Sequence, residues 1–245
     1  MPDLRQQLQA GPITLGALLS MPASTVGKIL RRNGCSRREQ PPATVYPRYE
    51  REVPGDLIHI DVKRLGRFFT PGKRILEDGV HRNPRAGWHY LHVAIDDHTR
   101  MAYAEVMTGQ GKAASCAFLE RSLSWFEEHL HTRVRQVMTD NGHAYRSYDW
   151  RDRCEARGIT HIRTRPYTPR TNGKAERLIK TMLGEWAYCY SYPTSAHRTR
   201  ALAGWVRWYN RRRPHASLGG KPPVRRHGRP VGGAACPRSG VAQAG

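Results

Sequence analysis

Three carboxylates, Asp61, Asp140 and Glu176, occupy positions where an acidic side chain is unusual unless it takes part in chemistry. Asp61 interrupts the apolar run 57–62, and Asp140 follows Thr139 at the end of a second predicted strand, 134–138. Glu176 stands early in a segment whose apolar residues recur at helical spacing, near the edge of the apolar stripe. A carboxylate on a core strand is costly unless it is paired or binds a metal ion. Grouped carboxylate oxygens are ligands that Mg²⁺ or Mn²⁺ prefers.

Two such cations, held about 3.5–4 Å apart, would clamp the attacking and leaving oxygens of a phosphoryl transfer. The charge of the chain is consistent with a phosphate-rich substrate: 41 Lys and Arg against 20 Asp and Glu leave +21. We therefore expect DNA or RNA as the partner, with no small-molecule substrate. No stretch reaches the roughly 18–20 apolar residues of a membrane span, and we expect a cytoplasmic, nucleoid-associated protein. The five scattered cysteines favour neither a zinc site nor a disulfide framework.

The elements that would position these acids read as a mixed α/β domain. Strands are predicted at 57–62, 88–96 and 101–107 as an antiparallel meander, then at 134–138 and 159–163. Helices are predicted at 113–130, 149–157 and 174–190, and loops at 66–87 and 166–173. Asp96 and Asp97 are interpreted as residues of a tight turn, and His59 and His92 as packing histidines. The fold class is thus a five-stranded mixed sheet flanked by helices.

Two short helices precede this domain, joined by a break at Ser20-Met21-Pro22. The second, 23–32, carries apolar Val26 and Leu30 on one face and ends in basic residues. This arrangement is typical of a helix-turn-helix, and a plain helical hairpin is the alternative. The predicted DNA contacts in this segment are Ser24, Thr25, Lys28, Arg31 and Arg32.

The last 60 residues contain 11 Lys or Arg and no acid, which is a strong local asymmetry. A predicted helix at 201–213 mixes Trp205, Trp208 and Tyr209 with arginines, as in surfaces that contact phosphates and stack on bases. The alternative is a helix packed on the core through its tryptophans, with solvated arginines. The predicted DNA contacts here are Arg207, Arg211, Arg212 and Arg213.

The spacing leads to a family resemblance. From Asp140 to Glu176 is 176 − 140 = 36 positions, so thirty-five residues intervene. Together with the blocks HIDVKRLGRF, YLHVAIDDHTRMAYAEV, MTDNGHAYRS, TPRTNGKAER and WYNRRRPHASLGG, this resembles insertion-sequence transposases of the DDE type with a retroviral-integrase-like core. The resemblance covers most of residues 55–222.

The resemblance implies an RNase H-like fold in which Asp61, Asp140 and Glu176 hold two Mg²⁺ or Mn²⁺ ions. It implies cleavage at the element's terminal repeats and transfer of the freed 3′-hydroxyl into target DNA, by a homo-oligomer on DNA. It also implies that Asn172 and Lys174 lie along the DNA backbone.

The expected domains are a partial helix-turn-helix at 1–38, a linker at 39–54 and a catalytic core at 55–190. A basic aromatic extension follows at 191–227 and a disordered tail at 228–245. Family members generally carry more DNA-binding sequence ahead of the core, so three interpretations stay open: a naturally shortened copy, a misplaced start or a decayed element. Two alternative functions stay open: an RNase H-like nuclease that cuts without joining, and a non-catalytic DNA-binding relic that represses transposition.

Overall fold

The computed structural model describes residues 2–8, 10–36, 50–72, 76, 86–164 and 172–227. The chain divides into two compact units, residues 1–49 and 50–245. Several predicted segments lie partly or wholly outside the described residues. They are residues 39–49 of the linker predicted at 39–54, residues 166–171 of the loop predicted at 166–173, most of the loop predicted at 66–87, and the tail from 228. Across the described ranges no single helix is long and apolar enough to cross a membrane; the bent pair 12–18 and 23–32 meets the length and composition limits only when its halves are combined.

The first unit contains three short helices, α1 (Pro2–Leu8), α2 (Pro12–Leu18) and α3 (Ala23–Arg32). The sequence predicted α2 and α3 but not α1. Helices α2 and α3 meet at 113°, an angle in the range of helix-turn-helix pairs. Gly16 permits this close turn, because a Cβ there would lie 2.6 Å from the Met21 carbonyl oxygen. Leu15, Val26 and Leu30 form the small core.

The second unit is built on a five-stranded sheet in the order β3-β2-β1-β4-β5. Its strands are β1 (Ile58–Gly66), β2 (Trp88–Asp96), β3 (Ala102–Met107), β4 (Gln136–Thr139) and β5 (Thr160–Arg163). The first three strands pair antiparallel, whereas β4 pairs in parallel with both β1 and β5. The predicted mixed sheet and meander are confirmed. The first strand was predicted to end at residue 62, but β1 continues to Gly66. Its polar second half, Lys63 to Gly66, pairs with Leu91 to Trp88 of β2.

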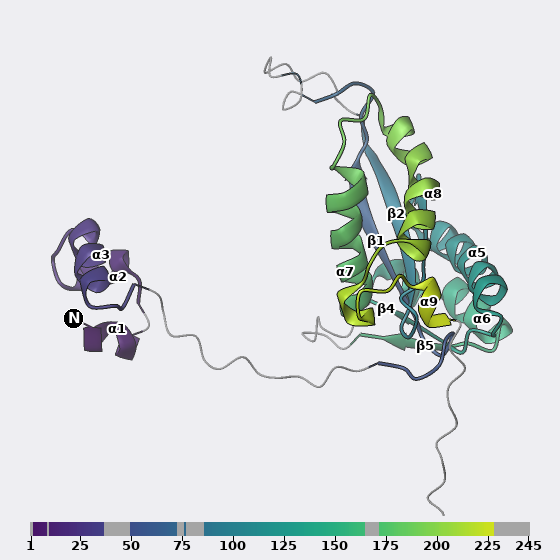
Figure 1. Ribbon diagram of the computed structural model, residues 1–245, viewed down its shortest axis with the longest axis horizontal. Coiled ribbons are helices and arrows are strands. Elements are labelled where there is room, and N and C mark those ends of the chain that lie inside the picture. Colours follow the sequence, from purple (N-terminus) through teal and green to yellow (C-terminus); the bar gives the residue numbers. More distant parts are fainter. Residues whose placement is uncertain are drawn as a thin grey trace, which may run out of the picture. The chain divides into compact units, whose positions relative to one another are not determined.

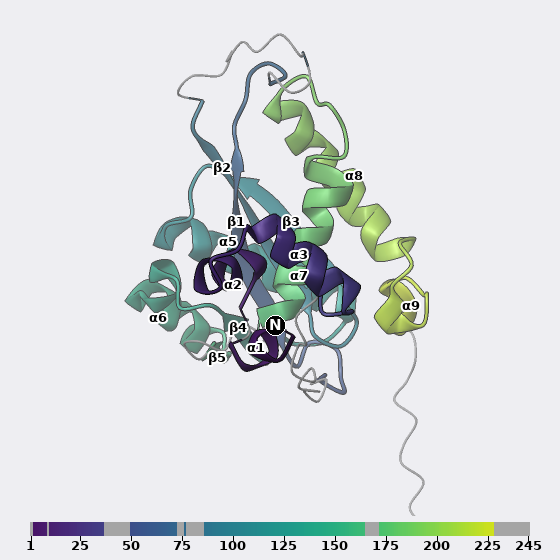
Figure 2. The ribbon, with the colours of Figure 1, turned by 90° about the vertical axis from the view of Figure 1, so that its left-hand side faces the viewer.

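Helices cover both faces of the sheet (Figures 1 and 2). Because side chains alternate along a strand, Ile58 and Ile60 face α5 (Lys112–Leu130) and α6 (Tyr148–Ala156). Leu65 faces the opposite layer, made of α7 (Gly173–Met182) and α8 (Ser195–Arg211). The odd-numbered residues His59 and Asp61 therefore point toward α7.

The predicted C-terminal extension is an integral layer of the second unit. Leu202 and Tyr209 of α8 are buried against the sheet, and the Asn210 side-chain amide bonds both backbone groups of Ala102 on the edge strand β3. A π-helical segment (Leu183–Ala187) follows α7, where the sequence predicted continuous helix to residue 190. Short elements complete the unit: η1 (His143–Arg146), η4 (Ala216–Leu218) and α9 (Val224–His227).

Candidate active site

Asp61 lies within β1, and Asp140 directly follows the last residue of the neighbouring parallel strand β4. In the β1–β4 register Ile58 pairs with Val137 and His59 with Met138, an offset of 79. Asp61 follows His59 by two residues and Asp140 follows Met138 by two residues, which puts Asp140 just past the end of β4. The carboxyl ends of parallel strands are a usual place for a functional site in an α/β fold.

Each of the two strand acids is oriented by its own backbone. Asp61 accepts a hydrogen bond from the Val62 amide at 2.7 Å. Asp140 accepts one from the Gly142 amide at 2.8 Å, which folds the chain sharply after β4. A Cβ at Gly142 would lie 2.8 Å from the Asp140 carboxylate oxygen, so a side chain there would require this carboxylate to shift. The Asn-Gly turn thereby presents Asp140 to solvent beyond the strand end.

Glu176 reaches the same place from α7. Ala175, Leu178 and Met182 of this helix are buried against the sheet, and Glu176 is exposed beside them. Burial, together with the charges of Asp140 and Glu176, raises the pKa of Asp61 from its ordinary 3.8 to about 6, against the lowering effect of the Val62 amide. The three acids are thus close enough to interact electrostatically. In the described part of the chain, Lys63 is the one basic residue among the causes of this pKa shift, and its lowering effect is weaker than the effect of either acid.

The donor set suits a hard divalent cation, since it consists of carboxylate oxygens only. Among the described residues, no three His, Cys, Asp or Glu side chains converge closely enough to hold an ion as they stand. Like charges repel, so we expect these carboxylates to close around a point only when a cation neutralises them.

Tyr145 packs beneath the acids and was not singled out from the sequence. It lies in η1, is 4% exposed, and contacts Trp150 edge-on at 4.8 Å between ring centroids. Burial raises the pKa of its hydroxyl, and the charges of Asp61 and Asp140 raise it further. No group in the described part of the chain lies within hydrogen-bond distance of that hydroxyl.

Replacing Tyr145 with phenylalanine is expected to raise the free energy of unfolding by about 1 kcal/mol, because a buried hydroxyl without a partner costs stability. Urea unfolding of the metal-free protein measures this directly. Tyr148→Phe provides the control, because that ring is 74% exposed and its change is expected to have no effect. A loss of stability at Tyr145→Phe larger than that at Tyr148→Phe would contradict the expectation.

Three of the predicted DNA contacts have other partners in this structure. Asn172 is 3% exposed and both its amide atoms bond inside the protein, so it is placed to position the start of α7. Arg213 forms a two-pronged pair with Glu185, at 2.7 and 2.5 Å. Lys174 is half-buried and pairs with Asp97. The spacing of the sequence gave no sign of these partners, which lie 28 to 113 positions away.

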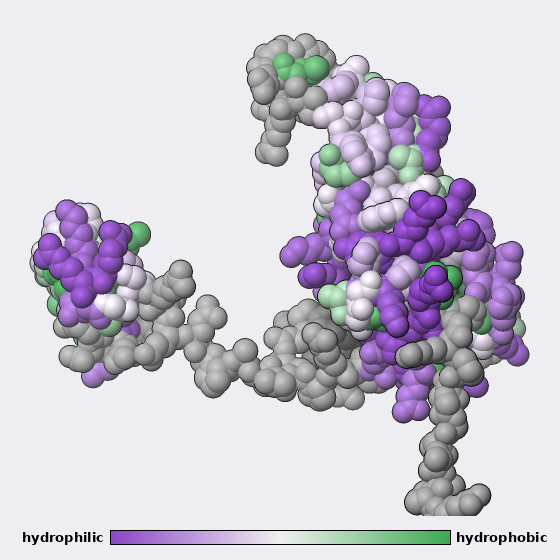
Figure 3. All heavy atoms as spheres, in the orientation of Figure 1, coloured by the Kyte–Doolittle hydropathy of each residue, from purple (hydrophilic) through white to green (hydrophobic). Residues whose placement is uncertain are grey.

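The other predicted contacts face solvent. Ser24, Thr25, Lys28, Arg31 and Arg32 are all exposed on α3, while Val26 and Leu30 fill the core behind them. On α8, Arg207, Arg211 and Arg212 are exposed, and Trp205 stacks on Tyr209 at 5.2 Å. Figure 3 shows strongly hydrophilic side chains over both helices on the face in view. The packing of Trp205 and Tyr209 and the exposure of these arginines agree with the alternative of a helix packed on the core, and contact of α8 with DNA stays a prediction.

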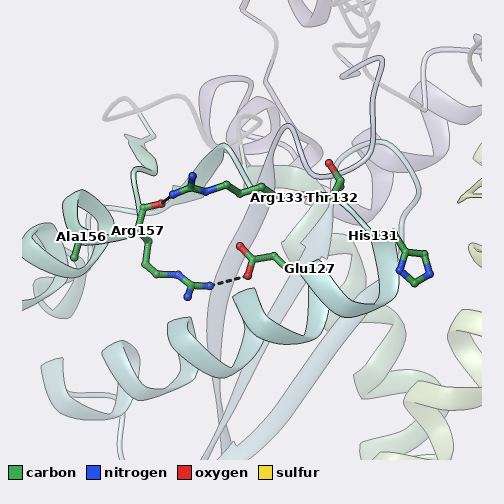
Figure 4. A pocket seen from close by; sticks show the side chains of 6 residues that line it. All are labelled: Glu127, His131, Thr132, Arg133, Ala156 and Arg157. Carbon is green, nitrogen blue, oxygen red and sulfur yellow. Dashed lines mark hydrogen bonds and ion pairs between the residues drawn. The ribbon is translucent and has the colours of Figure 1, made fainter.

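A pocket elsewhere on the unit is unconnected with the acids. It is lined by Glu127, His131, Thr132, Arg133, Ala156 and Arg157, at the end of α5 and before β4 (Figure 4). Arg157 pairs with Glu127 at 2.8 Å, and Arg133 donates to the Arg157 carbonyl at 2.7 Å. Arg133, Arg157 and Glu127 are thus bonded within the pocket. The pocket lies near the start of β4, whereas Asp140 follows the end of β4.

Comparison with known proteins identifies the domain. Two family models, both described as integrase core domain, match residues 52–169 and 157–223, which together are more than half of the chain. An insertion element IS136 protein of Agrobacterium fabrum is 31% identical over 81 residues, 33% of this chain and 42% of that protein. The Pol-related polyprotein of mouse intracisternal A-particle MIA14 is 34% identical over 95 residues, 38% of this chain and 10% of that one. The chain thus spans less than half the length of these curated relatives.

Solved structures show the same fold. The simian T-cell lymphotropic virus intasome, in complex with a PP2A regulatory subunit, aligns with a TM-score of 0.57 at 19% identity, covering 100% of this chain and 80% of that one. The HTLV-2 integrase catalytic core domain, in complex with magnesium, aligns with a TM-score of 0.50 at 16% identity, covering 72% of this chain and 98% of that one. The fold is therefore that of a retroviral integrase core, which is RNase H-like. The chain belongs to the integrase-like DDE transposases, a family of DNA integration and transposition.

Proposed function

We propose that this chain is the transposase of a bacterial insertion element, which cuts DNA at the element's ends and joins the freed 3′-hydroxyl to target DNA. The observation that carries the proposal is that Asp61 on β1, Asp140 just past the neighbouring parallel strand β4 and Glu176 on α7 are close enough to interact electrostatically. A cluster of three acids in a chain of net charge +21 suits a divalent cation and a DNA phosphate together.

The three carboxylates would hold two Mg²⁺ or Mn²⁺ ions. When bound, such ions polarise the scissile phosphate and make water or a 3′-hydroxyl a better nucleophile. The residues of this chain then have distinct tasks. Asp61, on the rigid strand β1, fixes the centre of the site, and Asp140 and Glu176 approach it from the turn after β4 and from α7. Neither step requires a covalent bond between protein and DNA, so no nucleophilic side chain is needed.

The DNA would be held outside the acid cluster by two basic surfaces. The first is α3 of the N-terminal unit, which we propose reads the terminal repeats as a recognition helix. The second is α8, whose three exposed arginines would contact phosphates without regard to sequence. Assembly of a homo-oligomer would bring two element ends together. The protein would act on DNA in the bacterial cytoplasm.

Replacing Arg207, Arg211 and Arg212 together with glutamine is expected to weaken DNA binding about equally for specific and unrelated duplexes. The slope of log affinity against log salt should fall by up to about 3, one for each lost phosphate contact. Fluorescence anisotropy at several salt concentrations measures both. Arg151→Gln, an exposed arginine of α6, is the control and should leave the slope unchanged. An unchanged slope in the triple variant would show that α8 does not contact DNA.

The proposal is tested by product analysis. A labelled duplex carrying the natural element end, taken from the DNA that flanks the gene, is incubated with protein, plasmid target and Mg²⁺ or Mn²⁺. The proposal expects label covalently joined to the plasmid. Cleavage of the duplex without joining would indicate a nuclease. Tight binding without any reaction would indicate the repressing relic.

A further inference from the structure

A buried polar network lies directly behind the three acids. His59, on β1 two residues before Asp61, is 2% exposed. Its Nε2 is 2.6 Å from a carboxylate oxygen of Asp97, and its Nδ1 is 3.2 Å from the side-chain oxygen of Asn172. Asn172 in turn donates from its amide nitrogen to the Ile60 carbonyl at 3.1 Å. The network thus spans β1, the β2–β3 turn and the residue that precedes α7.

The hydrogen-bond directions in this network follow from the chemistry of its groups. The Asn172 nitrogen is committed to the Ile60 carbonyl, which can only accept, so the Asn172 oxygen must face His59. The Asp97 carboxylate also accepts. His59 thus lies between two oxygen atoms, one from each partner. A flipped Asn172 amide would set two oxygens against each other, so the arrangement has a single consistent form.

Asp97 connects this network to the first turn of α7. Its carboxylate is fully buried and accepts from the Arg51 backbone amide at 2.6 Å, from His59 and from the Lys174 ammonium group. Burial acts to raise the pKa of Asp97, but the bonds from His59 and Lys174 hold it well below its ordinary value. The carboxylate is thus an ionised hub between β1 and α7.

Apolar packing does not fix α7 as closely as these bonds do. Ala175, Leu178 and Met182 set the distance of the helix from the sheet, but apolar contacts are non-directional and tolerate small shifts along the helix axis. Bonds to Asn172 and Lys174 hold the first turn at fixed points of β1 and of the β2–β3 turn. Glu176 lies two residues after Lys174, and Asp61 two residues after His59. The same network therefore fixes a residue two positions before each of these two acids.

We propose that His59, Asp97, Asn172 and Lys174 are positioning residues that set the distance of Glu176 from Asp61. The inference rests on the proposed function, because it assigns these residues to the geometry of the same metal site. Buried polar groups that orient metal ligands commonly change metal affinity when they are replaced. His59, Asp97 and Asn172 are too deeply buried to touch substrate, so their effect must pass through the acids.

The test compares Asp97→Asn with Asp96→Asn. Both acids are fully buried in the same turn, but Asp96 accepts only from Gly55 and Thr99 and does not reach α7. Titration of the full-length protein with Mn²⁺, followed by electron paramagnetic resonance, is expected to show about a tenfold or larger loss of affinity in Asp97→Asn. Asp96→Asn should lower the melting temperature but bind Mn²⁺ as the wild type does. Wild-type affinity in Asp97→Asn, or an equal loss in Asp96→Asn, would overturn the proposal.

Hydrogen exchange separates failure of the network from failure of the proposed function. In metal-free Asp97→Asn, amide protection should fall in the first turn of α7 and not in α5; in Asp96→Asn it should not fall selectively in α7. If the wild type binds no Mn²⁺, the proposed metal site fails, and this exchange pattern alone decides the network. Unchanged protection at the start of α7 would then overturn it. If Asp97→Asn does not fold, His59→Gln serves in its place with the same expectations.

Discussion

Asp140→Asn is expected to lower the rate of DNA cleavage and joining by at least about 1,000-fold, while the affinity for DNA stays within about twofold of the wild type. The substitution keeps the shape of the side chain and the bond from the Gly142 amide, so the turn after β4 survives. It removes a negative charge from the acid cluster, and a neutral amide is a poor ligand for Mg²⁺.

The measurement is a gel assay of labelled element-end DNA together with anisotropy of the same duplex. Asp152→Asn is the matched control, since Asp152 is an exposed acid of α6 that pairs with Arg151. It is expected to react at the wild-type rate. Activity of Asp140→Asn within tenfold of the wild type would remove Asp140 from the catalytic site. A joint loss of binding and activity would indicate unfolding, which circular dichroism detects.

Asp61→Asn is expected to make the metal-free protein more stable even though it abolishes activity. Burial and the nearby acids raise the pKa of Asp61 from 3.8 to about 6. The folded protein therefore binds this proton more tightly than the unfolded chain does. Its free energy of unfolding falls as pH rises from about 4 to about 6, and the full penalty persists above that range. Removal of the carboxylate should restore about 1–3 kcal/mol at pH 8.

Urea unfolding with a chelator, at pH 8 and again at pH 4, checks this expectation. The variant should exceed the wild type at pH 8, and the difference should vanish at pH 4, where Asp61 is protonated in the folded protein. Millimolar Mn²⁺ should reverse the order at pH 8, because only the wild type gains binding energy from the ion. A variant less stable than the wild type at pH 8 with chelator would show that Asp61 is not a source of electrostatic strain.

The strands and helices were predictable because they depend on local patterns, whereas Asp61, Asp140 and Glu176 were grouped through their flanking sequence blocks and the family resemblance. β2 matches its predicted bounds of 88–96, α5 starts one residue before its predicted start, and α6 is shifted by one residue at each end. Apolar runs and helical spacing determine such elements. The start of α8 at Ser195, six residues before the predicted start, is set instead by the Thr194 side chain, which accepts from the His197 amide. The break of α7 into a π-helical segment at Leu183 had no signal in composition, since Trp186 and Ala187 continue the apolar pattern and are buried.

The polar network was beyond sequence reasoning because its bonds join distant residues. The interpretation of Asp96 as a turn residue is confirmed by its bonds to Thr99, three positions away. Asp97 has the same sequence context, but its partners His59 and Lys174 are 38 and 77 positions away. His59 was interpreted as a packing histidine, which its burial confirms, yet its two bonds give it a directional role. Only the pairing of β1 with β2 and the packing of α7 bring these groups together.

Anomalous diffraction from crystals soaked in Mn²⁺ is the most direct test of the central claim, that Asp61, Asp140 and Glu176 form a catalytic cation site. The account predicts manganese density in contact with the carboxylates of Asp61 and Asp140, and a second site that contacts Glu176. The second site should be lost in Glu176→Gln crystals soaked alongside. Manganese bound only at other acids, or unchanged density in Glu176→Gln, would contradict the claim.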